Sequence, residues 1–278
     1  MDLTQLIAQH GAASWDKQVC LSDAIGDGDW QLSMSEGQIT FGGRQSFPMQ
    51  VLGSEADGDG TWLWAWANME SNLPPALLQA AAQIRAFGER ERVAEFVAPA
   101  LNLEDADGHK LSMIACGVCG ADAYYRGPYA GGAVFLLLTA PTLRRFADDT
   151  PMRFIRIFTE FISAFPCDHR QALAAYAASK SFPIQAEADT EIVTLPAGAE
   201  VRAEFDVQGR LVRFSSTLTA ENSAPRRKRS RGGSGAANAE TWRLILEIYH
   251  ADPRWDGGPA DGGARWADAD AGGEDAEL

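Results

Sequence analysis

The chain has 278 residues, of which 46% are hydrophobic, and its formal net charge at pH 7 is -14. This length and composition can bury a sizeable core, but the negative charge disfavours a chain-wide surface for nucleic acid or an anionic membrane. No apolar run approaches the ~20 residues that cross a bilayer, and the first residues do not resemble a signal peptide, so we expect a cytoplasmic protein.

The first part of the chain predicts one helix and then antiparallel strands. Residues 3–15 have the apolar spacing of an amphipathic helix. Alternating apolar residues in 30–34, 39–41 and 47–51 then predict three strands, the first two joined by a turn at Glu36-Gly37. The turn sequence DGDG at 57–60 leads into a fourth strand. It resembles the start of a calcium loop, but the residues after it do not supply the required ligands and glycine, so no calcium site is predicted.

The fourth strand, Thr61 to Asn68, has the sequence TWLWAWAN. Period-two alternation places Trp62, Trp64 and Trp66 on one face and only apolar residues on the other. Two apolar faces are typical of a strand that is covered on both sides. Because a buried indole N–H needs a partner, the sequence leaves open whether these tryptophans form a core or the wall of a pocket.

Helices and a strand pair are predicted next. Pro74-Pro75 opens a helix that Gly88 interrupts, a short amphipathic stretch follows at 93–97, and residues 111–119 predict another helix. Residues 121–126 and 133–139 then predict two strands joined by a turn rich in proline and glycine.

The second half predicts two helices and a hairpin. Pro151 begins a helix with apolar residues at helical spacing, and Asp168 is positioned to cap the helix at 171–178. Residues 201–205 and 211–214 predict strands joined by the turn Asp206 to Gly209. We therefore predict an α+β fold in which a largely antiparallel sheet packs against helices, in the order of four strands, helices, two strands, helices and a C-terminal hairpin.

We assign residues 1–220 to a single α+β domain and leave open whether it consists of two similar halves. Residues 221–239 are predicted to be a basic, glycine-rich linker, 240–250 a docking helix and 251–278 an acidic disordered tail. Whether Trp242 to Tyr249 docks on the domain is left open. The basic run Arg226 to Arg231 is interpreted as a solvated linker, with nucleic-acid binding as its alternative. Elsewhere in the chain nucleic-acid binding is disfavoured.

No cofactor or metal is predicted. Cys116 and Cys119 have the spacing of a zinc or dithiol pair, but the other cysteines and the histidines are scattered without motif spacing. We interpret the cysteine pair as part of a small-residue face that lets two elements approach closely. Cys167 and His169 are neighbours of the capping Asp168 and are not predicted to form a nucleophilic pair.

The best candidate for a ligand site combines the tryptophan strand with the motif AYYRGP. Arg126 is suited to hold a carboxylate or a phosphate, and it is equally suited to a structural role, either pairing with an acid of the protein or stacking on Tyr124 or a tryptophan. If the two strands lie close in one sheet, their aromatic residues form a cleft with Arg126 and Asn68 as polar groups. The candidate ligand-binding residues are Trp62, Trp64, Trp66, Asn68, Tyr124, Tyr125 and Arg126; no catalytic residue is predicted.

Four motifs give the chain a resemblance to a bacterial family, domain of unknown function 6882. They are LGS at Leu52 to Ser54, TWLWAWAN, YYRGP at Tyr124 to Pro128 and FDVQGRL at Phe205 to Leu211, so the resemblance extends over roughly Met1 to Leu218. It implies no activity, substrate or cofactor.

Two hypotheses about function lead, and zinc or redox chemistry at Cys116 and Cys119 is a weaker third. The first is a non-enzymatic domain that binds a protein, a peptide or a small ligand through an aromatic sheet face. The second is a hydrolase-like enzyme whose site around Tyr124 and Arg126 lacks a linear motif.

Overall fold

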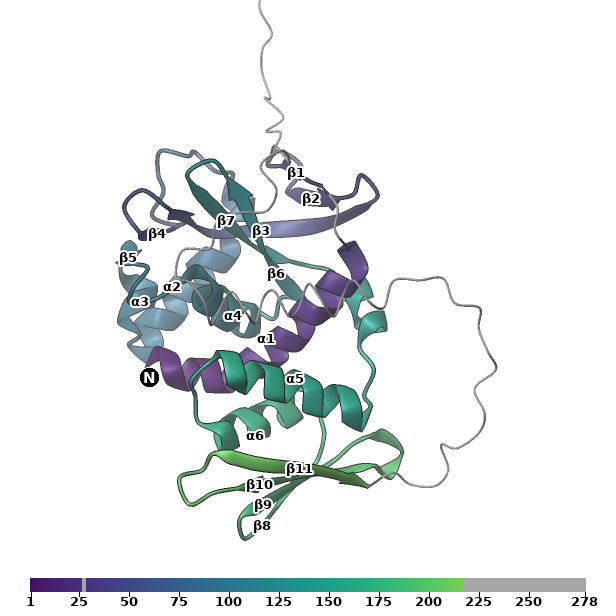
Figure 1. Cartoon of the computed structure of the whole chain (residues 1–278). Helices are drawn as coiled ribbons and strands as arrows, with labels where there is room; N and C mark the ends of the chain where they lie inside the picture. Colours follow the sequence, from purple (N-terminus) through teal and green to yellow (C-terminus); the bar gives the residue numbers. More distant parts are fainter. Residues whose placement is uncertain (27–28, 218–278) are drawn as a thin grey trace, which may run out of the picture. The chain divides into compact units, whose positions relative to one another are not determined.

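A computed structural model of the chain describes residues 1–26 and 29–217 (Figure 1). Their helices and two antiparallel sheets confirm the α+β prediction. The described residues form two compact units, one with residues 1–24, 116–118 and 142–217, the other with 25–26, 29–115 and 119–141. The predicted linker, docking helix, acidic tail and Arg226 to Arg231 lie outside the described residues, and the assignment of 1–220 to one domain stays a prediction.

The second of these units contains a seven-stranded sheet. Its strands are β1 (Trp30–Ser33), β2 (Gln38–Phe41), β3 (Gln45–Ala56), β4 (Thr61–Trp64), β5 (Ala100–Asn102), β6 (Ala123–Tyr129) and β7 (Gly132–Leu138). The long strand β3 organises the sheet, because it pairs antiparallel with β2, β4 and β7. Six of the strands were predicted. Strand β5 was not predicted, because its three residues are too few to show an alternating pattern.

The faces of this sheet are set by an irregularity in β3. Val51 pairs with Leu136 and Gly53 with Phe135, so Leu52 is an extra residue in the ladder between β3 and β7. Such a bulge bends a strand and re-aims the side chains that follow it. After the bulge, Gly53 and Glu55 lie on one face of the sheet, and Ser54 lies on the other.

Helices cover the face that carries Glu55 (Figure 1). They are the 3-10 helix η1 (Pro75–Leu77), α2 (Gln79–Glu91), α3 (Ala94–Val97) and residues 108–115 of α4 (Gly108–Val118). The prediction that Gly88 interrupts a helix is wrong, because α2 continues to Glu91. Gly88 instead permits close packing, since a Cβ atom there would lie 2.5 Å from the Cβ atom of Phe96.

The other unit packs helices against a four-stranded sheet (Figure 1). The helices are α1 (Leu3–Ile25), α5 (Pro151–Ala164) and α6 (His169–Ser179), and the strands are β8 (Ile184–Glu187), β9 (Thr190–Thr194), β10 (Glu200–Phe205) and β11 (Leu211–Thr217). The strand order is β11-β10-β9-β8. The hairpin β10–β11 and the cap of Asp168, which accepts a hydrogen bond from the Gln171 amide at 2.8 Å, are confirmed. The hairpin β8–β9 was not predicted.

A buried ion-pair cluster ties α1 to α5 and α6. The carboxylate of Asp16 accepts hydrogen bonds from Arg153 Nε at 3.0 Å, from Tyr176 Oη at 3.1 Å and from Lys180 Nζ at 2.9 Å. Asp16 and Arg153 are 6% and 8% exposed. Burial acts to raise the pKa of Asp16, but the charges of Lys180 and Arg153 outweigh it and leave this pKa below its ordinary value.

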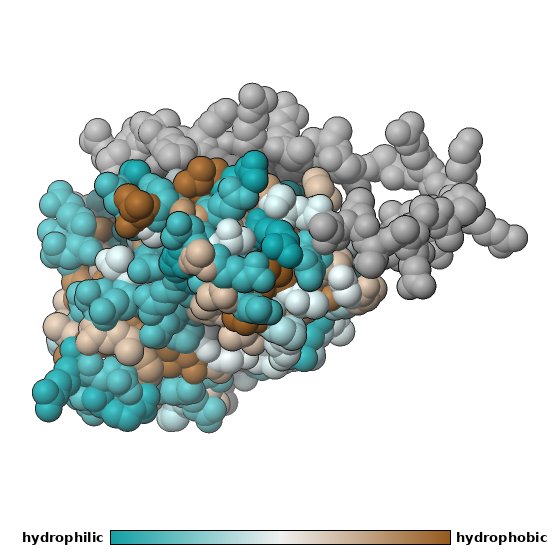
Figure 2. Space-filling model, turned by 90° about the horizontal axis from the view of Figure 1, so that it is seen from below, coloured by the Kyte–Doolittle hydropathy of each residue, from teal (hydrophilic) through white to brown (hydrophobic). Residues whose placement is uncertain are grey.

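The surface drawn in Figure 2 is mainly hydrophilic, and its hydrophobic areas are small and separated. This is ordinary for a folded protein and marks no docking face by itself. Among the helices of residues 1–26 and 29–217, none combines the length and the hydropathy that crossing a membrane requires.

Candidate functional site

The tryptophan strand is shorter than its sequence suggests. β4 ends at Trp64, and the next residues turn, because the Ala67 amide donates to the Trp64 carbonyl at 2.9 Å. The predicted strand through Asn68 is therefore wrong beyond Trp64. Trp66 does not continue the alternating face; its ring instead packs against the Arg85 guanidinium, whose Cζ atom lies 4.5 Å from the ring centroid.

The structure places Trp62 and Trp64 in the core, and neither is exposed. Their ring centroids lie 5.2 Å apart with the ring planes nearly perpendicular, and the indole N–H of Trp64 donates to the Glu95 carbonyl at 2.9 Å. Gly53, directly opposite Trp64 in the ladder, leaves room for Trp62, because a Cβ atom there would lie 2.4 Å from the Trp62 ring. These two tryptophans hold β4 against β3 and α3.

A polar cluster lies on the same face of the sheet, where α4 begins. Glu55 accepts hydrogen bonds from the Gly108 amide at 3.0 Å and from Arg126 Nε at 3.3 Å. Nearby, His109 Nδ1 lies 3.2 Å from the Tyr124 hydroxyl. Among the roles open to Arg126, the structure shows the pairing with an acid of the protein, Glu55.

Burial controls the pKa values in this cluster. It raises the pKa of Glu55, an effect that the Arg126 charge and the Gly108 amide oppose. It lowers the pKa of His109 to about 4, although Asp107 acts in the opposite direction. His109 is therefore a neutral imidazole at neutral pH.

This neutral histidine predicts a loss of stability in mild acid. The unfolded chain takes up a proton near pH 6.5 and the folded chain only near pH 4, so the stability that neutral His109 provides is present above pH 6.5 and lost as the pH falls to about 4. Relative to a His109→Gln variant, we expect wild type to lose on the order of 2–3 kcal/mol across this window.

Urea unfolding of the two proteins at several pH values measures the difference. Glu55 titrates in both proteins, so the comparison isolates His109. A difference in unfolding free energy that stays constant between pH 4 and 6.5 would contradict the burial of a neutral imidazole.

The opposite face of the sheet carries a pocket. Ser54 on β3 is paired with Val134 on β7, and Val134 is paired with Gly127 on β6. Directly paired residues project to the same face, and alternation adds Tyr129, two residues after Gly127, to that face. Three strands thus provide the floor of the pocket.

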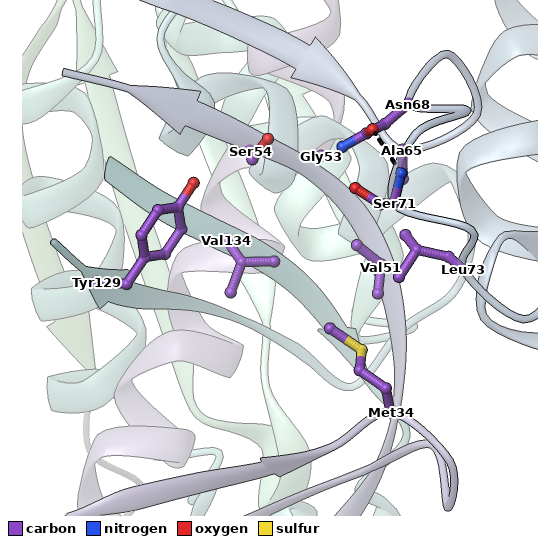
Figure 3. A pocket seen from close by; sticks show the side chains of 10 residues that line it. All are labelled: Met34, Val51, Gly53, Ser54, Ala65, Asn68, Ser71, Leu73, Tyr129 and Val134. Atoms are coloured by element: carbon purple, nitrogen blue, oxygen red, sulfur yellow. Dashed lines mark hydrogen bonds between the residues drawn. The ribbon is translucent and has the colours of Figure 1, made fainter. Parts of the chain in front are cut away.

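The pocket has a volume of about 400 Å³. It is lined by Met34, Val51, Gly53, Ser54, Ala65, Asn68, Ser71, Leu73, Tyr129 and Val134. Figure 3 shows these side chains converging from the sheet, from the turn after β1 and from the segment after β4. Asn68 Oδ1 accepts a hydrogen bond from the Ser71 amide at 3.2 Å, which fixes the segment after β4 over the edge of the pocket.

Four of the lining side chains are polar, those of Ser54, Asn68, Ser71 and Tyr129. Burial, followed by the negative charges of Asp57 and Glu55, raises the pKa of Tyr129, so its phenol stays protonated at neutral pH. The pocket therefore offers hydroxyl and amide groups, in an otherwise apolar lining, to anything that enters it.

The seven residues predicted from sequence do not form one cleft. Asn68 lines the pocket, whereas Trp62, Trp64, Tyr124 and Arg126 lie on the opposite face of the sheet. Tyr125 is on the pocket face, but its ring packs on Phe41 and Trp30, with centroid distances of 4.8 and 5.9 Å. Ligand binding by any of the seven stays a prediction.

Sequence reasoning missed the rest of the pocket. Tyr129 could have been found from the alternation of Tyr125, Gly127 and Tyr129, and Gly53 and Ser54 belong to the LGS motif. Met34, Ser71 and Leu73 lie in turns and irregular segments, where no periodic pattern exists to mark them.

The cysteine motifs have ordinary structural surroundings. Cys116 is buried, and Cys119 Sγ lies 3.7 Å from the Ala80 carbonyl. Burial raises the pKa of Cys167 to about 11, so it is a neutral thiol, and His169 Nδ1 accepts a hydrogen bond from the Leu211 amide at 3.0 Å. Within the described residues, no three His, Cys, Asp or Glu side chains gather as a metal site would require.

Comparison with known proteins gave one family. Residues 4–141 match the model of a family of unknown function, DUF6882. The matched segment includes LGS, TWLWAWAN and YYRGP, whereas FDVQGRL and the four-stranded sheet lie beyond it. Searches of the curated proteins and of the solved structures found no match.

Proposed function

Residues 4–141 belong to DUF6882, a family of unknown function, and from the geometry of this segment we propose that the protein binds a small molecule in the pocket between Ser54, Asn68 and Tyr129. The observation that carries the proposal is the pocket itself. About 400 Å³ lies within the range of small-molecule sites, and an apolar lining with a few convergent polar groups is typical of them.

Several features favour a small molecule over a protein or a peptide. The floor is made of paired strands, so the site is largely preformed. The hydrogen bond between Asn68 and the Ser71 amide fixes the segment that borders the pocket. The space is a concave pocket, whereas a protein partner needs a broad surface of about 800 Å² on each side.

A substitution that fills the pocket tests this proposal. Ser54 projects into the pocket from β3, so Ser54→Phe places a phenyl ring where the ligand would lie. Fluorescence titration with the uncharged probe N-phenylnaphthylamine measures binding in wild type and in this variant. We expect the affinity of the variant to be at least tenfold lower, because a loss of ~1.4 kcal/mol of binding free energy lowers the affinity tenfold.

Met69→Phe is the matched control. Met69 is 83% exposed and does not line the pocket, so a ring added there leaves probe binding unchanged while adding the same kind of apolar surface. Circular dichroism and urea unfolding establish that both variants are folded. Equal probe affinity in folded Ser54→Phe and in wild type would refute binding in this pocket.

The second candidate is hydrolase-like chemistry at Tyr124 and Arg126. The distance of 3.2 Å between His109 Nδ1 and the Tyr124 hydroxyl favours it, since an acid–base pair needs such contact. A pKa of about 4 makes His109 a weak base at neutral pH, and Tyr124 is 5% exposed, so binding remains the leading proposal. If the wild-type protein hydrolyses p-nitrophenyl acetate and Tyr124→Phe abolishes this activity, the enzyme hypothesis would become the leading one.

A further inference from the structure

The chemistry of the pocket lining narrows the ligand to one class. We infer that the pocket takes an uncharged, partly apolar molecule and rejects an anionic analogue of the same shape. This inference rests on the proposed function, because it concerns the ligand of the same pocket.

No lining residue carries a full charge at neutral pH. The apolar part of the lining comes from Met34, Val51, Ala65, Leu73 and Val134, and the polar part consists of hydroxyl groups and one carboxamide. An anion that enters such a site loses water and gains no Lys or Arg partner, which is costly. A cation likewise finds no carboxylate among the lining residues.

Two acidic residues that act on Tyr129 disfavour an anion as well. Glu55 follows Ser54 directly on β3, and Asp57 is held at the end of β3 by a hydrogen bond from its amide to the Gly131 carbonyl at 3.0 Å. Gly132 is paired with Ala56 on one side and with Tyr129 on the other, and a Cβ atom there would lie 2.0 Å from the Glu55 backbone carbonyl oxygen and 3.3 Å from the Tyr129 hydroxyl. The Tyr129 end of the pocket therefore lies beside the stretch of chain that carries Glu55 and Asp57, and the charges of both side chains act on the Tyr129 phenol.

Glu55 is paired with Arg126, yet its charge and that of Asp57 both disfavour ionisation of the Tyr129 phenol. An anionic ligand group beside Tyr129 would meet the same repulsion. Neutral hydrogen-bonding groups avoid it.

The polar groups suit a neutral partner. The carbonyl oxygen of the Asn68 side chain is already engaged by the Ser71 amide, so this side chain offers its NH2 group. The hydroxyl groups of Ser54 and Ser71 can donate or accept, and the protonated Tyr129 phenol can do both. A carbonyl, ether or hydroxyl group on an aromatic or aliphatic body matches this set.

Two probes with the same ring system, one uncharged and one carrying an anionic sulfonate group, test the inference. N-phenylnaphthylamine is uncharged, and anilinonaphthalene sulfonate has the same ring system with one sulfonate. Both are titrated into the full chain by fluorescence, in wild type, Ser54→Phe and Met69→Phe. The titrations are repeated in about 1 M salt, where the Debye length of ~3 Å removes repulsion by the net charge of the whole protein.

The expected result is that the uncharged probe binds in the pocket and that the sulfonate binds at least about tenfold more weakly there, in low and in high salt, because desolvation of an unpaired anion is not screened. Equal or tighter binding of the sulfonate, still abolished by Ser54→Phe, would overturn the ligand class and leave the proposed function intact. Binding of neither probe, or binding that Ser54→Phe does not change, would overturn the proposed function itself.

Discussion

Replacing Asp16 by asparagine is expected to lower the free energy of unfolding by about 3–5 kcal/mol, the cost of breaking a buried ion pair. Asp16 is the carboxylate to which Arg153, Lys180 and Tyr176 all donate, and it is 6% exposed. Asparagine keeps the size of the side chain but leaves the Arg153 guanidinium, 8% exposed, without its counter-charge.

The control is an ion pair at the surface of the same unit. Glu204 pairs with Arg213, whose side chain is 66% exposed, and Glu204→Gln is expected to change the unfolding free energy by about 0–1 kcal/mol. Urea unfolding of both variants measures the difference. Similar, small losses in the two variants would show that the Asp16 cluster does not stabilise the packing of α1 on α5 and α6.

The same variant has a defined pH dependence. The folded pKa of Asp16 lies below its ordinary value of 3.8, because Lys180 and Arg153 outweigh the effect of burial. The stability that its charge provides is therefore present above pH 3.8 and lost as the pH falls through the lower, folded pKa. The difference in unfolding free energy between wild type and Asp16→Asn should therefore become smaller only as the pH falls below 3.8.

Replacing Trp64 by alanine is expected to cost about 3–5 kcal/mol, the usual loss for a large aromatic residue in a core. Trp64 has no exposed surface, packs on Trp62 and Phe96, and donates its N–H to the Glu95 carbonyl. Its removal leaves a cavity between β4 and α3 and an unpaired carbonyl.

Trp66→Ala is the comparison within the same motif. Trp66 is half-buried, and its contact with the Arg85 guanidinium is worth about 0.5–1 kcal/mol at such a site. The free energy of unfolding measured in urea should therefore be clearly lower for Trp64→Ala than for Trp66→Ala. Equal losses would mean that the three tryptophans act alike, as one continuous strand face would require.

Local patterns predicted the elements of this fold well. Alternation placed Trp62 and Trp64 on one face, and the capping preference of Asp168 identified the start of α6. The prediction failed at Trp66, because strand periodicity cannot show where a strand ends. It also failed at Gly88, because the close approach of Phe96 that explains this glycine is a tertiary contact.

The pocket could not be predicted for a related reason. Its floor depends on the pairing of Ser54 with Val134, two residues far apart in the sequence, and on the bulge at Leu52 that sends Ser54 to this face. Asp16 and Arg153, which form an ion pair, are even farther apart in the sequence. A single sequence records neither strand order nor register across such separations.

The most direct test of the pocket is the methyl spectrum of methionine. The chain has six methionines; Met34 lines the pocket, whereas Met152 is 74% exposed in the other unit. In protein labelled with carbon-13 at the methionine methyl groups, the signal that Met34→Leu removes identifies Met34. Titration with N-phenylnaphthylamine should shift this signal and leave that of Met152 in place. An unchanged Met34 signal at saturating probe would contradict small-molecule binding in this pocket.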